Sequence, residues 1–219
     1  MTKPALIFDM DGVILDTEQV VRRSWNLAAK DYGLENSDSV FLLTVGTTWK
    51  HTYHILHQHY GTDFPAEEFH SALSKRYHTI EKTEGVPVKT GARELLQWAK
   101  QNGFRLGLAS STQQSIVERE LGKENLLQYF DYVLGGDRIA RSKPFPDIYE
   151  TACRDMQIPP AEAFAIEDSY NGIRSSHAAG MMPVMIPDLL PPTEEMRQLS
   201  HSIFASLTEF QAYLEREFC

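Results

Sequence analysis

The amino-acid sequence predicts an α/β protein, with a parallel β-sheet core that is interrupted near its start by an all-helical insert. Short apolar runs alternate with helical stretches over most of the chain, which is typical of strand–helix–strand units with parallel strands. A block of about 70 residues after the first run shows no strand pattern, and it is too long for an ordinary connection. The length of 219 residues, with 42% hydrophobic and 23% charged residues, suits one globular domain that carries a smaller insert.

The strands of the core are predicted from apolar runs that are short, continuous and without helical periodicity, as buried parallel strands are. The first run covers residues 5–8, between Pro4 and Asp9. Similar runs cover residues 106–109, 132–134, 163–166 and 183–186, and a short last strand is expected near Ile203.

The helices of the core are predicted between these runs, at residues 92–101, 147–156, 171–179 and 207–217. In the first of them, Leu95, Leu96 and Ala99 recur at helical spacing, and Gly103 follows the end as a helix-terminating glycine. Asp147 follows two prolines, so we expect it to cap its helix.

The insert is predicted to be entirely helical. One helix should stop at Tyr32 and Gly33, and two more should cover residues 48–60 and 66–81. Residues 84–87 read as the hinge by which the chain returns to the core. The expected division is therefore a core of residues 1–16 and 88–219 and a helical domain of residues 17–87.

Charge and composition exclude several classes of protein. The formal net charge is −9, without a lysine- or arginine-rich run, so we expect no nucleic-acid partner and no membrane surface. No apolar run approaches the ~18 residues of a membrane-spanning helix, and an acidic pair comes too early for a signal peptide. Two cysteines, Cys153 and Cys219, cannot build a disulfide framework. We expect a cytoplasmic protein, and a monomer.

The first chemical motif is Asp9-Met10-Asp11-Gly12, directly after the first predicted strand. Asp9 and Asp11 are two residues apart at a strand end, where their side chains can converge and where open α/β sheets bind ligands. Close carboxylates repel unless a cation lies between them, and Mg²⁺ is the simplest cation for an all-oxygen site. Alone, the motif is a weak signal and is more often two solvated loop acids than a metal site.

Three further motifs follow later strands. The run Ser110-Ser111-Thr112 ends a strand at a predicted helix start, which makes either an anion site or a plain helix cap. Lys143 stands in a proline-bounded loop and could be an ordinary surface lysine. Glu167 and Asp168 end an apolar strand, and two acids there need a metal or another cation.

Together, these four motifs resemble, in order and spacing, those of the haloacid dehalogenase (HAD) superfamily, and most closely its β-phosphoglucomutase-like phosphatase branch. The resemblance runs from Ile7 to the Asp188-Leu-Leu-Pro-Pro segment. It implies a Rossmann-like core with a helical cap inserted after the first strand. It also implies the following site residues: Asp9 as nucleophile; Asp11 as general acid and base; Ser110, Ser111 and Lys143 on the phosphoryl group; and Mg²⁺ held by Asp9, Asp11 through its backbone carbonyl and Asp168, with Glu167 assisting directly or through water.

The activity that the resemblance implies is Mg²⁺-dependent hydrolysis of a small phosphate ester, a sugar phosphate or a similar metabolite, through an aspartyl-phosphate. Asp11 favours ester chemistry, because members that cleave C–halogen or C–P bonds lack this second acid. A phosphosugar mutase is the alternative. However, Val21 and Trp49 stand where β-phosphoglucomutases carry a histidine and an arginine. A non-catalytic phosphometabolite-binding module is a third reading, although none of Asp9, Asp11, Lys143 and Asp168 has been lost.

Overall fold

The structure is a computed structural model that describes residues 3–45, 47 and 49–218. It divides into two compact units. One unit consists of Met1–Leu15 together with Val88–Cys219, and the other of Asp16–Pro87. The first unit holds the sheet, and in the second unit all the regular elements of the described residues are helices.

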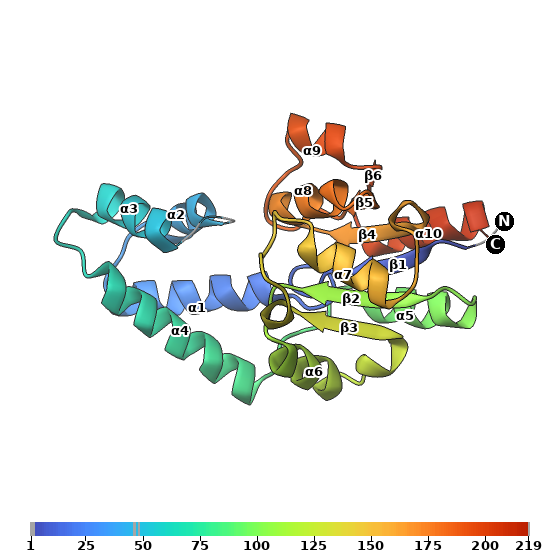
Figure 1. The fold of residues 1–219 in the computed structure, drawn as a ribbon. Helices are drawn as coiled ribbons and strands as arrows, with labels where there is room; N and C mark the ends of the chain where they lie inside the picture. The colour runs from blue at the N-terminus through green and yellow to red at the C-terminus, as the bar shows by residue number, and fades with distance from the viewer. Residues whose placement is uncertain (1–2, 46, 48, 219) are drawn as a thin grey trace. The chain divides into compact units, whose positions relative to one another are not determined.

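Six parallel strands form one sheet in the described part of the first unit, in the order β3-β2-β1-β4-β5-β6 (Figure 1). The strands are β1 (Ala5–Phe8), β2 (Leu106–Ser110), β3 (Tyr132–Gly135), β4 (Ala163–Glu167), β5 (Met182–Met185) and β6 (Ser202–Ile203). The predicted α/β class with a Rossmann-like parallel sheet is confirmed, because each predicted apolar run became a strand within one residue of its expected bounds.

The strand order reverses beside β1, which pairs with β2 on one side and with β4 on the other. Phe8 is opposite Leu108 in one neighbour and Ile166 in the other. The three strands therefore end at the same level, and the residues that follow Phe8, Leu108 and Ile166 come together. Such a reversal is where open α/β sheets bind ligands.

Helices cover both faces of the sheet. They are α5 (Ala92–Gln101), α6 (Gln114–Lys123), α7 (Asp147–Asp155), α8 (Tyr170–Ala178), α9 (Glu194–Leu199) and α10 (Leu207–Phe218). Alternate strand residues point to opposite faces. On one face, Ile7 and Ala165 pack against Tyr149 and Cys153 of α7. On the other face, Phe164 meets Phe210 of α10 edge to face at 5.9 Å between ring centroids.

Two local predictions in this unit need correction. Helix α7 begins at Asp147 itself, and the capping position belongs to Pro146, whose backbone is already helical. The Asp147 carboxylate instead accepts hydrogen bonds from Arg141, at 2.8 and 3.0 Å. Helix α9 follows the predicted loop of residues 187–192 and was not expected. Its N-cap is Thr193, whose hydroxyl accepts from the Met196 amide.

The second unit contains α1 (Thr17–Asp31), α2 (Ser37–Thr44), α3 (Trp49–Tyr60) and α4 (Ala66–Thr83). Its core is aromatic, with the buried Trp25 ring against Phe41 and Phe69. Helix α2 was not predicted, and Thr48, the expected first residue of the helix predicted over residues 48–60, lies outside the described residues. No helix in the described chain is long and apolar enough to cross a membrane; the cytoplasmic location and the monomeric state stay predictions.

The chain leaves and re-enters the first unit at one place. Leu15 forms an isolated antiparallel bridge with Val88, and the Lys89 amide donates to the Ile14 carbonyl at 2.9 Å. Within the second unit, the Asp16 amide donates to the Pro87 carbonyl at 2.7 Å. The two ends of the inserted segment are therefore tied side by side by backbone hydrogen bonds.

Candidate active site

The loop after β1 places the first pair of acids. The Asp9 amide donates to the Ile166 carbonyl at 2.9 Å, which fixes this residue at the edge of the sheet, and its side chain is buried. The chain then turns at Gly12, whose φ is +75°. A Cβ atom on Gly12 would lie 2.2 Å from Asp168 Oδ2. Glycine is therefore required here both by the backbone conformation and by the close approach of Asp168.

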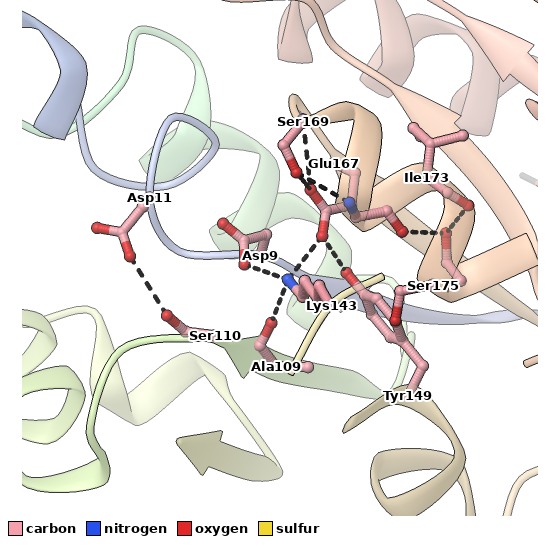
Figure 2. Close-up of polar contacts among 12 residues, drawn as sticks. Asp9, Asp11, Ala109, Ser110, Lys143, Tyr149, Glu167, Ser169, Ile173 and Ser175 are labelled. Atoms are coloured by element: carbon pink, nitrogen blue, oxygen red, sulfur yellow. Dashed lines mark hydrogen bonds and ion pairs between the residues drawn. The ribbon is translucent and has the colours of Figure 1, made fainter. Parts of the chain in front are cut away.

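Lys143 lies at the centre of the site (Figure 2). Its ammonium donates to Asp9 Oδ1 at 2.6 Å, to Glu167 Oε1 at 2.6 Å and to the Ala109 carbonyl at 3.1 Å. Only 7% of the lysine side chain is exposed. An ammonium has three hydrogens, so these three acceptors use its full donor capacity. The reading of Lys143 as an ordinary surface lysine is therefore wrong.

Glu167 ends β4 and is completely buried. Its Oε1 accepts from Lys143 and from the Tyr149 hydroxyl, each at 2.6 Å, and its Oε2 accepts from the Ser169 hydroxyl at 3.0 Å (Figure 2). Ser169 also caps α8, because its Oγ accepts from the Gly172 amide at 3.0 Å. The glutamate is thereby fixed against the first turn of that helix.

The charges of the site are strongly coupled. Burial raises the pKa of Asp9 to about 7; Lys143 opposes this shift, whereas Glu167 and Asp11 add to it. Burial alone would lower the pKa of Lys143, but the carboxylates of Asp9 and Glu167 outweigh it and hold this pKa well above its usual value. The lysine is therefore a permanent cation among carboxylates, and a second cation would favour the ionised form of Asp9.

Asp11 belongs to a second group of contacts, with hydroxyls from the end of β2. Thr112 Oγ1 donates to Asp11 Oδ2 at 2.8 Å, and Ser110 Oγ donates to the same oxygen at 3.3 Å. The Thr112 amide donates to Ser110 Oγ at 3.0 Å. These contacts orient the Asp11 carboxylate toward the end of β2 and link the first two motifs.

A metal site is offered by Asp9, Glu167 and Asp168, which present carboxylate oxygens within 4.8 Å of one another. Hard divalent cations such as Mg²⁺ prefer oxygen ligands of this kind. The oxygen ligands and their spacing therefore fit Mg²⁺, the predicted cofactor. Glu167 Oε1 in addition accepts two hydrogen bonds, from Lys143 and Tyr149. The Asp11 side chain is not part of this group, and its predicted contribution is a backbone carbonyl.

The structure thus brings together most of the residues predicted from sequence: Asp9, Asp11, Ser110, Lys143, Glu167 and Asp168. Ser111 is exposed, and helix α6 begins only at Gln114, so the expected helix start directly after the hydroxyls is wrong. Three contributors were not predicted, namely Thr112, Tyr149 and Ser169. The hydroxyl run gave a signal for Thr112, whereas Tyr149 reads in the sequence as one more apolar core residue of α7.

Comparison with known proteins identifies the family. The family model of haloacid dehalogenase-like hydrolases matches residues 6–186. The chain belongs to this family. It is 32% identical to Protein CbbY of Rhodobacter capsulatus over 85% of this chain and 86% of that protein. It is 30% identical to the Phosphorylated carbohydrates phosphatase of Thermotoga maritima, over 81% and 82%.

The fold agrees with a solved structure of the family. The crystal structure of CbbY from Rhodobacter sphaeroides in complex with phosphate superimposes with a TM-score of 0.69, at 28% identity, over 95% of this chain and 96% of that one. The predicted resemblance to HAD hydrolases is confirmed, and so is the enzyme class of a HAD-like phosphoric monoester hydrolase.

Proposed function

We propose that this HAD-like hydrolase removes phosphate from small phosphorylated sugars or similar metabolites, with Mg²⁺ as cofactor and Asp9 as nucleophile. The observation that carries the proposal is the buried Lys143 ammonium, which binds Asp9 and Glu167 at once beside the Asp168 carboxylate. Phosphoryl transfer needs little from a protein beyond positioning and charge neutralisation, and this cluster supplies both. The name of the Thermotoga maritima relative, a phosphatase of phosphorylated carbohydrates, supports the substrate class.

The proposed mechanism assigns one role to each contact. The Asp9 carboxylate attacks phosphorus and forms an aspartyl-phosphate, which divides one difficult step into two. Lys143 holds Asp9 in place and neutralises charge on the phosphoryl oxygens, and Ser110 and Ser111 donate to them. Asp11 protonates the leaving alcohol and later accepts a proton from the attacking water. Asp9, Asp168 and Glu167, with the Asp11 carbonyl, would hold Mg²⁺, which neutralises further phosphoryl charge when bound.

We propose the helical unit as a cap that selects the substrate, in a division of core residues 1–16 and 88–219 and cap residues 17–87. A cap that closes over the site would exclude bulk water and present residues that distinguish one phosphate ester from another. The adjacent ends of the inserted segment, joined at Leu15 and Val88, are compatible with a hinge of two short connections.

The test is phosphate release from a panel of sugar phosphates, nucleotides and other small esters, with Mg²⁺ and with EDTA. We expect Mg²⁺-dependent release from one or a few sugar phosphates. Asp9→Asn should abolish turnover and keep the fold, because the amide preserves the shape of the side chain but is not a nucleophile.

Other outcomes would replace the proposal. Conversion of β-glucose 1-phosphate to glucose 6-phosphate without phosphate release would show a mutase. No reaction on either test would favour the phosphometabolite-binding module. Activity of Asp9→Asn near that of the wild type would contradict the covalent mechanism.

A further inference from the structure

Tyr149 stands among apolar residues and directs its one polar atom at the site. It lies on α7 and is completely buried in a cluster that includes Ile148, Ala152 and Cys153. Its hydroxyl donates to Glu167 Oε1 at 2.6 Å (Figure 2). A phenylalanine would fill the same apolar space, so the hydroxyl is the part of this residue that packing does not explain.

The Tyr149 hydroxyl also supplies the second of the two hydrogen bonds that Glu167 Oε1 accepts. Glu167 Oε1 accepts from both Tyr149 and Lys143, and a carboxylate oxygen has about two acceptor sites. The Ser169 hydroxyl binds the other oxygen, Oε2. With donors on both oxygens, the carboxylate cannot turn about its terminal bond without breaking a buried hydrogen bond.

The aromatic ring also contacts the lysine directly. The Lys143 ammonium lies 5.1 Å from the centroid of the Tyr149 ring, within the range of a cation–π contact. Tyr149 therefore touches both members of the Lys143–Glu167 ion pair, one through its hydroxyl and the other through its ring. Neither contact reaches Asp9, on which the proposed chemistry takes place.

We propose that Tyr149 is a positioning residue, which acts by fixing the Glu167 carboxylate and, through it, the Lys143 ammonium against Asp9. Without the hydroxyl, Glu167 can rotate and Lys143 can follow it, so that the oxygens offered to a metal and to a phosphoryl group are no longer held in one arrangement. The role rests on the proposed phosphatase function, which it refines.

The first test compares two variants that lose the same chemical group. Tyr149→Phe removes the hydroxyl from Glu167 and keeps the ring. Tyr132→Phe is the matched control, because the Tyr132 hydroxyl also donates to a carboxylate at 2.6 Å, that of Asp155, outside the site. Tyr149→Phe should fold, since Glu167 Oε1 keeps its bond from Lys143, and circular dichroism would verify this.

The expected effect of Tyr149→Phe is a loss of about 10- to 100-fold in Mg²⁺ affinity or in kcat, the range found when partners of metal ligands are removed. Mg²⁺ affinity is measured by isothermal titration calorimetry, and kcat and KM with the preferred ester. KM should change less than kcat, because the hydroxyl does not contact the substrate. Tyr132→Phe should match the wild type in all three quantities.

The second test asks whether the hydroxyl acts through Glu167. In a Glu167→Gln background, Tyr149→Phe should cause a much smaller further loss than it causes in the wild type, because contacting partners are not additive. An equal further loss would overturn the proposal, as would Tyr149→Phe with both Mg²⁺ affinity and kcat within twofold of the wild type. If the wild-type protein released no phosphate, the proposed function would fail, while calorimetry on the same variants would still decide the role of Tyr149.

Discussion

Gly172 gives the sharpest test of the packing around Glu167. Replacing a glycine inside a helix with alanine usually stabilises a protein, whereas here we expect the same replacement to destabilise it. It lies in the first turn of α8 (Tyr170–Ala178). A Cβ atom at this position would be 1.9 Å from the Glu167 carboxyl carbon and 2.0 Å from each of its oxygens. Inside a helix, alanine is ordinarily more stable than glycine by about 1 kcal/mol. In Gly172→Ala, the clash with the carboxylate should outweigh this gain.

The magnitude follows from the distances. Ordinary contact of a Cβ atom begins at 3.4 Å, so the Glu167 carboxylate must move by about 1.4 Å. Such a shift breaks or strains its bonds from Lys143 and Tyr149. Overpacking costs about 1–3 kcal/mol, and a weakened hydrogen bond to a charged group costs about 1.5–3 kcal/mol. After subtraction of the helix gain of about 1 kcal/mol, the free energy of unfolding should fall by about 1.5–5 kcal/mol.

The assay is thermal unfolding together with phosphate release. For a chain of this size, Gly172→Ala should lower the Tm by roughly 3–20 °C, and activity should fall at least about tenfold. Gly122→Ala is the control, because a Cβ atom on Gly122 in α6 meets nothing within 4 Å. That substitution should raise the Tm by about 2 °C and leave activity unchanged. An equal rise in Tm for both variants would refute the packing argument.

Two further predictions concern protons. Mg²⁺ affinity should rise as the pH increases from about 6 to 8, because the pKa of Asp9 is raised to about 7 and a metal binds the ionised carboxylate. At about pH 6, binding should release a proton. Equal affinities at both pH values, measured by calorimetry, would contradict this prediction. Thr112→Val removes the hydroxyl that donates to Asp11 at 2.8 Å. It should lower kcat about tenfold for esters with poor leaving groups and less for p-nitrophenyl phosphate, whose leaving group needs little protonation. Equal losses of kcat on both kinds of ester would argue against Asp11 as the general acid.

The sequence predicted the sheet well because buried parallel strands are continuous apolar runs, and the acids stand directly at their ends. The sequence alone therefore places Asp9, Glu167 and Asp168 at one edge of the sheet. Their partners were harder to foresee. Tyr149 follows the apolar spacing of α7, so nothing in the sequence separates its buried hydroxyl from an ordinary core tyrosine.

The helical unit was less predictable, for a physical reason. Helix α2 (Ser37–Thr44) buries Val40 and Phe41 but exposes much of Leu42 and Leu43, so its four consecutive apolar residues show no helical period. In α7, the two prolines correctly indicated a helix start. They could not show that Pro146 already adopts a helical backbone, which moves the cap by one residue.

The short backbone stem at Leu15 and Val88 has a consequence for how such a protein can change over evolution. Because the segment between them begins and ends at neighbouring points, it can be lengthened, shortened or exchanged without moving the sheet and the loops that hold Asp9 and Lys143. Domains with adjacent termini tolerate transplantation for the same reason. The catalytic residues and the substrate selectivity could then evolve separately, because the sheet unit would stay unchanged while the helical unit is exchanged.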